Sequence, residues 1–217
     1  MRHVVWDWNG TLLADLDAIV GATNAGLADS GLAAIDRDRF RRVFGRPVRA
    51  FNERLLGRSL TDEQWRILDD AFHDHYRQQL QHCELADGAE AALELVARAG
   101  VGQSLLSMWR HDELLDLLAQ RGLAEAFTRI DGDQRFDGGP KSDRLRDHLN
   151  AQRLDPRHVV LIGDTLDDAT AAHALGARCL LVAEHSSHHL PALQAAAATV
   201  PTVLDAATRV LAMLDRS

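Results

Sequence analysis

The sequence predicts an α/β fold, in which a Rossmann-like parallel sheet forms the core and an α-helical segment is inserted after the first strand. Three short apolar runs predict the sheet: HVVWD at 3–7, GQSLLS at 102–107 and HVVLIGD at 158–164. Each run is too short for a helix and is rich in residues that suit a buried strand. Because helical patterns alternate with strands from about residue 85 onward, we expect parallel strands with helices on both faces.

Further elements of the same core follow these runs. RCLLV at 178–182 is a fourth apolar run, and TRIDGD at 128–133 is a weaker fifth. The helical patterns of this region are GAEAALELVARAG, HDELLDLLAQRG, KSDRLRDHLNAQ, DDATAAHALG and TVLDAATRVLAML. The fourth of these ends at Gly176, which is typical of a helix C-terminus. Outside these elements, the alanine-rich residues 195–198 are the one low-complexity tract.

Residues 16–82 interrupt the alternation, because they contain helical patterns only. Within the last pattern, Thr61 and Gln64 have the spacing of a capping box, which starts a helix. An all-helical insertion between the first strand and the remaining strands is typical of a lid. We therefore expect a core domain of residues 1–15 and 83–217 and an α-helical cap domain of residues 16–82.

Composition limits the classes of function. The chain has 217 residues and a formal net charge of −8, with 46% hydrophobic residues. Such a charge disfavours nucleic-acid binding, which normally needs a basic stripe. The sequence contains neither a run of ~18 apolar residues nor a signal-peptide pattern, so we expect a cytoplasmic protein without a membrane partner. Cys83 and Cys179 lack metal-site spacing and are expected to be reduced, buried thiols.

The residues that end the three apolar runs carry reactive side chains. These residues are Asp7, Ser107 and Asp164. Ligands of open parallel sheets bind beyond the carboxyl ends of the strands, so the three side chains should share one crevice. Lys141, the only lysine of the chain, begins a following helix. Carboxylates are the usual ligands of Mg²⁺, and a lysine at a helix N-terminus suits a phosphate.

Four motifs occur together in a fixed order. They are DWNGT at 7–11, Ser107 in LLSMW, Lys141 in GGPKSD, and GDTLDD at 163–168. In order and spacing the chain resembles the haloacid dehalogenase (HAD) superfamily, and within it the phosphoglycolate-phosphatase-like branch with a helical cap. The resemblance implies a Mg²⁺-dependent phosphatase that acts on a small phosphorylated metabolite, as a monomer or a homodimer.

The resemblance also implies roles for individual residues. Asp7 would attack phosphorus and form an aspartyl-phosphate that water then hydrolyses. Mg²⁺ would be held by Asp7, the Asn9 backbone carbonyl and Asp164, with Asp168 as an outer or second ligand. The implied phosphate-binding residues are Ser107, Met108, Lys141 and Gly10, and the implied catalytic residues are Asp7, Asn9, Thr11, Ser107 and Lys141. Gly10 would permit the tight turn and Thr11 would steady the loop.

Simpler structural roles remain open for several of these residues. Asp164 and Asp168 are four residues apart and suit the start of a helix, where carboxylates interact favourably with the helix dipole. Ser107 is also compatible with an ordinary N-cap. Lys141 is compatible with an exposed surface lysine.

Asn9 departs from the family pattern, which has a second aspartate here as general acid and base. Such acid–base help is worth roughly 10²–10⁴ in rate. Four explanations are open: substrates with good leaving groups such as acyl phosphates, an acid supplied by the cap, loss of catalysis in favour of ligand or partner binding, and deamidation of Asn9-Gly10. Under the third explanation the chain is a catalytically weak HAD protein.

Other chemistries have less support from the sequence. Phosphonoacetaldehyde hydrolases carry DWAGT but need a cap lysine, and residues 16–82 contain none. Haloacid dehalogenases do not use Mg²⁺, whereas the intact GDTLDD favours a metal site. Walker, HExxH, CxxC and G-x-S-x-G motifs do not occur, so NTPase, zinc and serine-hydrolase classes lack support.

Substrate selection is expected from residues that face the cap. The candidates are Arg46, Arg49, Trp109 and Arg110, and an arginine there would suit an anionic substrate. HSSHH at 185–189 resembles a transition-metal site in composition only, because it lacks a ligand geometry with a partner carboxylate. We expect it to form a polar surface loop.

Overall fold

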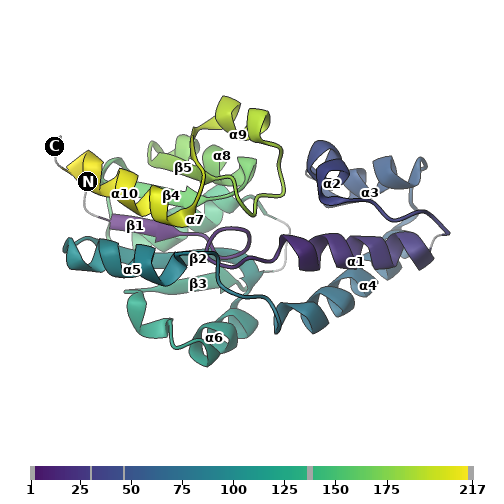
Figure 1. Ribbon diagram of the computed structural model, residues 1–217, viewed down its shortest axis with the longest axis horizontal. Helices are drawn as coiled ribbons and strands as arrows, with labels where there is room; N and C mark the ends of the chain where they lie inside the picture. The colour runs from purple at the N-terminus through teal and green to yellow at the C-terminus, as the bar shows by residue number, and fades with distance from the viewer. Residues whose placement is uncertain (1–2, 30, 46, 136–138, 215–217) are drawn as a thin grey trace.

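A computed structural model describes residues 3–29, 31–45, 47–135 and 139–214. Its centre is a six-stranded parallel sheet with the order β3-β2-β1-β4-β5-β6 (Figure 1). The strands are β1 (His3–Trp6), β2 (Gly102–Arg110), β3 (Ile130–Asp133), β4 (Val159–Gly163), β5 (Arg178–Val182) and β6 (Ala198–Val200). The predicted α/β class is therefore confirmed.

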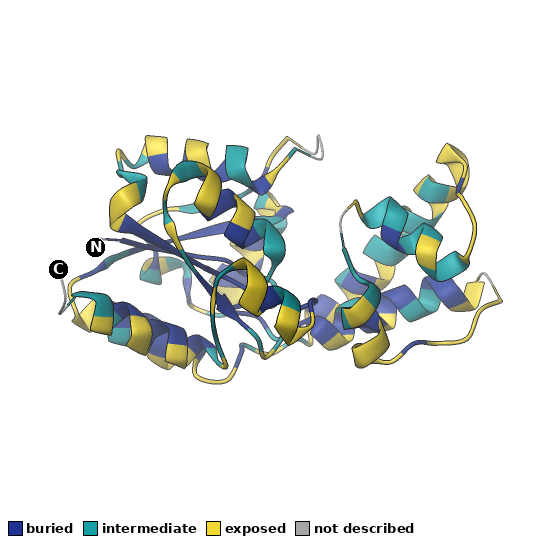
Figure 2. Ribbon diagram, turned by 90° about the horizontal axis from the view of Figure 1, so that it is seen from above, coloured by how far each residue is buried: buried dark blue, intermediate teal, exposed yellow. Residues whose placement is uncertain are grey.

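Side-chain alternation along the strands creates two apolar layers. In β1, Val4 and Trp6 belong to one buried cluster, whereas Val5 belongs to another on the opposite face. The first cluster is completed by side chains of α5, α6 and α10, and the second by side chains of α7 and α8. A strand with both faces buried is expected to be apolar throughout, as observed. In Figure 2 the strands are dark blue between helices whose outer faces are yellow.

The core helices follow the predicted order with one addition. They are α5 (Ala89–Arg98), α6 (His111–Gln120), α7 (Lys141–Ala151), α8 (Leu166–Leu175), α9 (Leu190–Ala196) and α10 (Val203–Leu214). The sequence did not predict α9 and β6, which between them contain most of the alanine-rich residues 195–198. Alanine has a low β propensity, so the sequence does not indicate a strand here. β6 forms because it pairs with β5, for example at Leu181 and Thr199.

Strand β2 extends beyond its predicted end at Ser107. It continues to Arg110 and pairs there with Asp133 of β3, after a register irregularity that begins at Leu106. The prediction placed the end of the strand at the end of the apolar run, but pairing with the neighbouring strand decides where a strand ends. The 3₁₀ turns Ala124–Ala126 and Pro156–His158 complete the connections.

The helical segment after β1 contains α1 (Leu16–Asp29), α2 (Arg37–Val43), α3 (Val48–Leu56) and α4 (Asp62–Leu80). We refer to α1–α4 as the helical block. It lies at one end of the sheet, to the right in Figure 1, and has its own apolar cluster around Phe40 and Phe51. The predicted capping box is confirmed, because the Thr61 hydroxyl accepts from the Gln64 amide and the Gln64 side chain accepts from the Thr61 amide.

The HSSHH segment contacts the helical block and is not the surface loop that the sequence predicted. Ser186 is fully buried and His188 is 9% exposed. Arg41 of α2 donates to the backbone carbonyls of Glu184 and Ser186, at 2.8 and 2.9 Å. The ring of Phe44 lies 5.2 Å from that of His188. Composition predicted exposure because it cannot show that another element covers the segment.

The two cysteines are free thiols, and both have intermediate exposure rather than the burial expected from the sequence. Among the helices that the structure describes, none combines the length and the apolar character that crossing a membrane requires.

A chain of polar side chains connects β1, β2 and β3 with α7, on the face of the sheet that carries the second apolar cluster. His3 Nε2 lies 2.8 Å from Ser104 Oγ, which lies 2.7 Å from His148 Nε2. His148 Nδ1 lies in turn 2.6 Å from Asp131 Oδ2. Ser104 is fully buried, so this Ser–His–Asp arrangement is closed to a substrate. It satisfies polar groups within the core.

Burial and the facing His148 lower the pKa of His3 from 6.5 to about 4. Below about pH 6.5 the unfolded chain therefore binds a proton at this residue that the folded chain does not, and stability falls towards pH 4. We expect His3→Gln to remove this contribution. In urea unfolding, the loss of stability between pH 7.5 and pH 5 should be smaller in His3→Gln than in wild type by on the order of 1 kcal/mol. Equal losses in the two proteins would contradict this assignment.

Candidate active site

Three adjacent strands deliver the predicted side chains to one edge of the sheet. Asp7 follows β1, Asp164 follows β4, and Ser107 lies in β2, which pairs with the other side of β1. The Asp7 amide donates to the Ile162 carbonyl at 2.8 Å, so the pairing of β1 and β4 continues to the reactive residue. The order β2-β1-β4 thus brings together residues that are far apart in the sequence.

Lys141 links two of the carboxylates. Its ammonium lies 2.8 Å from Asp7 Oδ1 and 2.5 Å from Asp168 Oδ1. Lys141 is 5% exposed, so the alternative of a surface lysine is wrong. Oxygen atoms of Asp7, Asp164 and Asp168 lie within 4.8 Å of one another, and all three residues are buried. The side chains therefore meet at one point.

Asp168 has a structural role in addition to its place in the cluster. Thr165 is the N-cap of α8, and Asp168 Oδ2 accepts from the Thr165 amide at 3.0 Å and from its hydroxyl at 2.6 Å. The alternative of a helix-start carboxylate is thus correct for Asp168. Its second oxygen, Oδ1, contacts Lys141. One carboxylate both fixes the start of the helix and orients the lysine.

Two glycines allow the carboxylates to approach the backbone. Gly10 has φ +70°, a conformation that favours glycine, and a Cβ at this residue would overlap the Asp164 carboxylate. A Cβ at Gly163 would likewise overlap the Asp168 carboxylate. The glycine of the DWNGT motif is therefore required for the close packing of the two loops, as well as for the turn itself.

Burial dominates the electrostatics of the cluster. It raises the pKa of Asp7 from 3.8 to about 7, against the lowering effect of Lys141. Burial and the neighbouring carboxylates raise the pKa of Asp164 well above its ordinary value. The pKa of Asp168 is lowered despite its burial, because Lys141 and Thr165 stabilise its charge. The two carboxylates raise the pKa of Lys141, which stays protonated.

These residues fit a divalent cation. Asp164 Oδ1 is buried and has no hydrogen-bond partner within the part of the chain that the structure describes. When ionised, the three carboxylates carry two more negative charges than Lys141 neutralises, and a divalent cation balances that excess. Hard oxygen ligands of this kind suit Mg²⁺ rather than a softer metal.

The side chain of Asn9 is held from three sides. Its Oδ1 accepts from the Ser107 hydroxyl at 3.2 Å, and its Nδ2 donates to Asp15 Oδ2 at 2.9 Å and to the Tyr76 hydroxyl at 2.8 Å. Ser107 Oγ also accepts from the Trp109 amide at 3.0 Å. Ser107 lies inside β2, and the N-cap of α6 is Arg110, so the N-cap alternative for Ser107 is wrong.

Asp15 and Tyr76 are part of the site, and the sequence analysis assigned them no role. Asp15 is fully buried and accepts hydrogen bonds from the Gly10 amide at 2.7 Å, from Asn9 Nδ2 and from the Tyr76 hydroxyl. Burial raises the pKa of Asp15, while these donors oppose the rise. Tyr76 is the only tyrosine of the chain, so the sequence alone could have drawn attention to it. The sequence could not show that Tyr76, in α4, lies beside the loop that follows β1.

Two other sequence-predicted residues lie close to these groups. Thr11 is fully buried, and its amide donates to the Trp8 carbonyl at 3.2 Å, within the turn that follows Asp7. Met108 lies next to Ser107 and lines the cavity described below. The structure thus places Asp7, Gly10, Met108 and Lys141 around one space.

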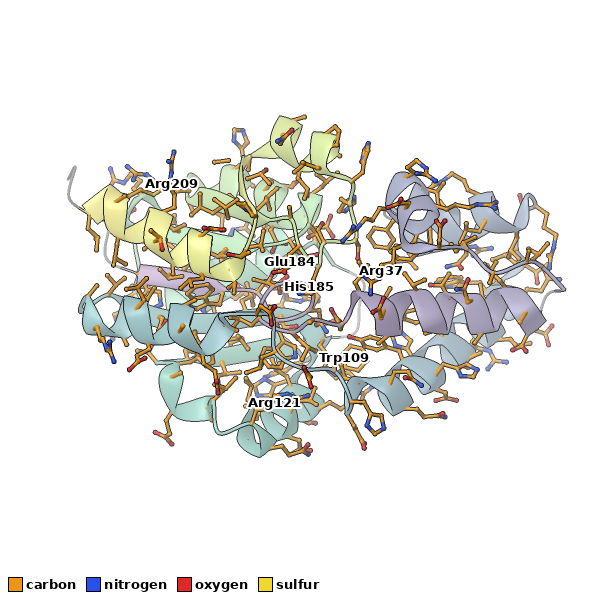
Figure 3. All side chains as sticks on the ribbon, viewed as in Figure 1. Arg37, Trp109, Arg121, Glu184, His185 and Arg209 are labelled. Carbon is orange, nitrogen blue, oxygen red and sulfur yellow. The ribbon has the colours of Figure 1, made fainter. Side chains whose placement is uncertain are left out.

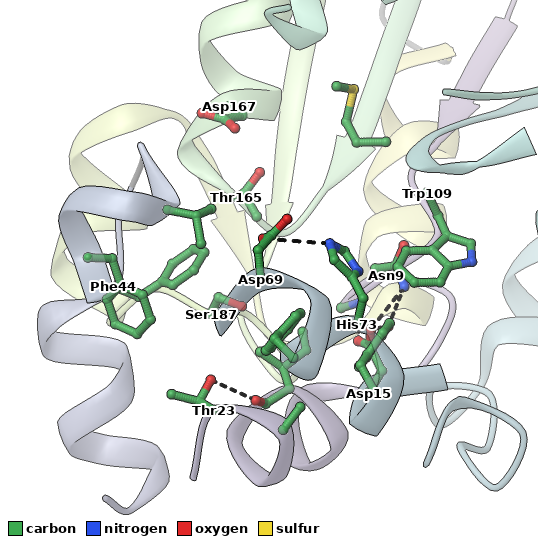
Figure 4. A pocket seen from close by; sticks show the side chains of 18 of the residues that line it. Asn9, Asp15, Thr23, Phe44, Asp69, His73, Trp109, Thr165, Asp167 and Ser187 are labelled. Atoms are coloured by element: carbon green, nitrogen blue, oxygen red, sulfur yellow. Dashed lines mark hydrogen bonds and ion pairs between the residues drawn. The ribbon is translucent and has the colours of Figure 1, made fainter. Parts of the chain in front are cut away.

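A cavity of about 500 Å³ joins the carboxylate cluster to the helical block. Trp109 lines it where the sheet meets α4 and lies 5.1 Å from the Tyr76 ring (Figure 3). His73 and Asp69 of α4 also line it, with His73 Nε2 at 3.8 Å from Asp69 Oδ1 (Figure 4). The cavity therefore has a charged end at the sheet and a second wall in α1–α4.

Two of the three predicted specificity arginines lie away from the cavity. Arg49 does not line the cavity, and it pairs with Asp62 at 2.7 Å and with Glu53 at 3.4 Å. Arg110 does not line it either and lies 3.1 Å from Glu113. Arg46 lies outside the described residues. Of the four predicted specificity residues, only Trp109 contributes to the described cavity wall.

Comparison with known proteins agrees with this geometry. Residues 4–182 match the model of the haloacid dehalogenase-like hydrolase family. A phosphoglycolate phosphatase from Chromobacterium violaceum is 24% identical, over 84% of this chain and 85% of that protein. An N-acetylmuramic acid 6-phosphate phosphatase from Pseudomonas aeruginosa is 25% identical, over 84% of this chain and 81% of that protein.

Solved structures show the same fold at lower identity. A haloacid dehalogenase-like hydrolase from Streptococcus pneumoniae has a TM-score of 0.83 at 17% identity, over 97% of this chain and 98% of that chain. A hydrolase from Pseudomonas syringae has a TM-score of 0.77 at 20% identity, over 100% of this chain and 99% of that chain. The extent of the family match, together with the convergence of the motif residues, leads to one conclusion: this chain belongs to the haloacid dehalogenase-like hydrolases.

Proposed function

We propose that the protein is a Mg²⁺-dependent phosphatase that hydrolyses a small phosphorylated metabolite through an aspartyl-phosphate on Asp7. The observation that carries the proposal is the contact of Lys141 with both Asp7 and Asp168, beside Asp164. The phosphatase names of relatives that match most of the chain support the same reaction class. In this proposal residues 16–82 form the cap over a core of residues 1–15 and 83–217.

The reaction has two steps at Asp7. A carboxylate oxygen of Asp7 forms a bond to phosphorus while the bond from phosphorus to the leaving oxygen breaks, and the leaving oxygen takes the electron pair. Water then attacks the aspartyl-phosphate, which releases inorganic phosphate and restores the carboxylate. Lys141 and Ser107 are the side chains suited to bind the phosphoryl oxygens, because one is cationic and the other is a hydroxyl at the same edge.

Asp7, Asp164 and the Asn9 backbone carbonyl would hold Mg²⁺, with Asp168 as an outer or second ligand. When bound, the cation supplies positive charge that offsets the charge of the phosphoryl group and of the buried carboxylates. Lys141 keeps its positive charge at neutral pH, since its pKa is raised. The Asp7 carboxylate must be ionised in order to attack, and a cation beside it favours that form.

Asn9 determines which leaving groups suit the site. Its Nδ2 is engaged by Asp15 and Tyr76, and an amide cannot protonate a leaving oxygen as a carboxylic acid does. In this proposal the site therefore combines the phosphoryl-binding side chains Ser107 and Lys141 with an amide in place of the usual acid. Substrates whose leaving group departs unprotonated are favoured.

Asp7→Asn should abolish phosphate release, because an amide is a poor nucleophile at phosphorus. We expect a loss of at least about 10³-fold in kcat for any substrate that wild type hydrolyses, including acetyl phosphate. The matched control is Asp17→Asn, which changes an exposed carboxylate on α1 and should leave kcat unchanged. Phosphate release that persists in Asp7→Asn would show that Asp7 is not the nucleophile.

Mg²⁺ should stabilise the protein as well as activate it. The cation relieves repulsion among ionised carboxylates, and burial raises the pKa of Asp7 to about 7. Mg²⁺ should therefore raise the melting temperature more at pH 8 than at pH 6, since protons compete for the ligands at lower pH. EDTA should abolish turnover, and Asp164→Asn should lose most of the Mg²⁺-dependent rise in Tm. A Tm that does not respond to Mg²⁺ at either pH would argue against the metal site.

Exchange of Asn9 and Asp15 tests how the missing acid is accommodated. Asn9→Asp alone would place two carboxylates at the 2.9 Å separation of the present hydrogen bond, which is unfavourable unless one stays protonated. The double variant Asn9→Asp/Asp15→Asn restores the hydrogen bond with reversed polarity. We expect the single variant to have a lower Tm than wild type, and the double variant to recover it.

The double variant should also gain turnover of alkyl phosphates by at least about tenfold over wild type, toward the 10²–10⁴ range of general acid catalysis. Steady-state phosphate release with Mg²⁺ measures this gain. If Asn9→Asp alone is as stable and as active as the double variant, Asp15 does not control the protonation at residue 9.

A further inference from the structure

We propose that the substrate, within the phosphatase function proposed above on which this inference rests, is the phosphate monoester of a phenol-type aromatic compound. Two independent features of the site support this class. One is the composition of the cavity wall formed by the helical block. The other is the chemistry of Asn9 at the position next to the leaving oxygen.

The wall of the cavity opposite the carboxylates is apolar and largely aromatic. It is formed by Phe44, Phe51, Trp65, Leu68 and Phe72. The centroids of the Phe44 and Phe51 rings are 5.3 Å apart, at an interplanar angle of 69°. Aromatic side chains favour another ring in edge-to-face or offset contact. A leaving group that binds there buries its surface against apolar side chains, which favours the binding of an uncharged ring over that of a polar chain.

Among the described residues of the cavity wall, a carboxylate on the leaving group finds no unengaged lysine or arginine. Among the described residues that line the cavity, Lys141 is the only lysine or arginine, and it contacts Asp7 and Asp168. His73 lies beside Asp69, so any positive charge on its ring is already matched. An unpaired carboxylate desolvated in this cavity would bind poorly.

Asn9 imposes the same preference through the reaction itself. A phenol has a pKa of about 10, whereas water, and an alkyl alcohol like it, has a value near 16. A phenolate therefore departs without a general acid, while an alkoxide does not. In the first step the Asp7 oxygen bonds to phosphorus and the bond from phosphorus to the aryl oxygen breaks. The phenolate leaves with the electron pair and takes a proton from water afterwards. This step therefore needs no general acid, which is the group that the site lacks.

The size of the cavity agrees with an aromatic leaving group. A volume of about 500 Å³ lies within the range of ~300–1,000 Å³ that is typical of pockets for ligands larger than glycolate. Trp65 and Leu68 line the same cavity as Asp7, so a ring attached to the phosphoryl group has apolar side chains to contact. A two-carbon leaving group would leave most of that wall in contact with water.

Binding of unreactive analogues separates recognition from leaving-group reactivity. Phenylphosphonate and 2-naphthylphosphonate should inhibit the Mg²⁺-loaded enzyme at least about tenfold more tightly than phosphonoacetate, an analogue that carries a carboxylate. Acetyl phosphate serves as the reporter substrate for these inhibition constants. Phosphonoacetate binding as tightly as the aryl phosphonates would overturn the inference.

Turnover tests the second feature. For wild type we expect kcat/KM to decrease from 2-naphthyl phosphate and phenyl phosphate to cyclohexyl phosphate and phosphoglycolate. The difference between phenyl and cyclohexyl phosphate, which match in shape, should shrink at least about tenfold in Asn9→Asp/Asp15→Asn, because an acid then assists the alkoxide. Phosphoglycolate as the best substrate of the series would overturn the inference.

Trp65→Ala tests the wall directly, with Ile67→Ala as the matched control on the same helix. Trp65 lines the cavity, whereas Ile67 is 56% exposed and does not. The ratio of kcat/KM for 2-naphthyl phosphate to that for acetyl phosphate should fall at least about fivefold in Trp65→Ala and stay unchanged in Ile67→Ala. Melting temperatures of both variants establish that they fold. An unchanged ratio in Trp65→Ala would contradict the assigned wall.

Acetyl phosphate also separates failure of this inference from failure of the proposed function. Asp7-dependent hydrolysis of acetyl phosphate without a preference for aryl groups would overturn the substrate class and leave the phosphatase function intact. If wild type with Mg²⁺ released phosphate from none of these compounds, both proposals would be wrong.

Discussion

The contact of the Lys141 ammonium with the Asp7 and Asp168 carboxylates is the interaction on which the rest of the site depends. Three carboxylates gather at the carboxyl edge of the sheet, and burial would favour their neutral forms without a buried cation among them. Lys141 stabilises the charge of Asp168 and opposes the rise in the pKa of Asp7. The arrangement also needs the glycines at 10 and 163, since a side chain at either would overlap a carboxylate. Charge balance and close backbone packing thus act together at one edge of the sheet.

The replacement of an acid by Asn9 is integrated into the surrounding structure. The amide bridges the core and the helical block, because it contacts Ser107 of β2 on one side and Tyr76 of α4 on the other. Asp15 accepts from the same amide and from the Gly10 backbone, so it fixes the turn that follows the nucleophile. A carboxylate at residue 9 would oppose Asp15 at hydrogen-bond distance. The amide is therefore the residue type that suits this network, and under the proposed function it would favour leaving groups of low basicity.

The helical block contributes side chains of α1–α4 to the wall of the cavity. It also contacts the core at the backbone carbonyls of Glu184 and Ser186 and at the ring of His188; Ser186 and His188 belong to a segment that sequence composition places on the surface. Of the arginines that suggested an anionic substrate, Arg49 is engaged by Asp62 and Glu53 at the junction of α3 and α4, and Arg110 lies 3.1 Å from Glu113. Arg46 lies outside the described residues. Under the proposed function, selectivity would depend on the aromatic side chains that line the cavity, whose pattern in the sequence is that of an ordinary helix core.

The sequence by itself determined the fold class, the sequence positions of the main strands and the motif residues that gather at one edge of the sheet. Apolar runs of strand length and the four motifs are local signals, and parallel pairing brings the ends of adjacent strands together. It could not determine the short strand β6, the extension of β2 to Arg110 or the burial of His188, because each depends on contacts with elements distant in sequence. The same holds for Asp15 and Tyr76, 61 residues apart, which join the site only when α4 packs beside the first loop. Local sequence patterns determine which helices and strands a segment can form. Tertiary packing determines which side chains are buried, which carboxylates lie close enough to interact, and which side chains line the cavity.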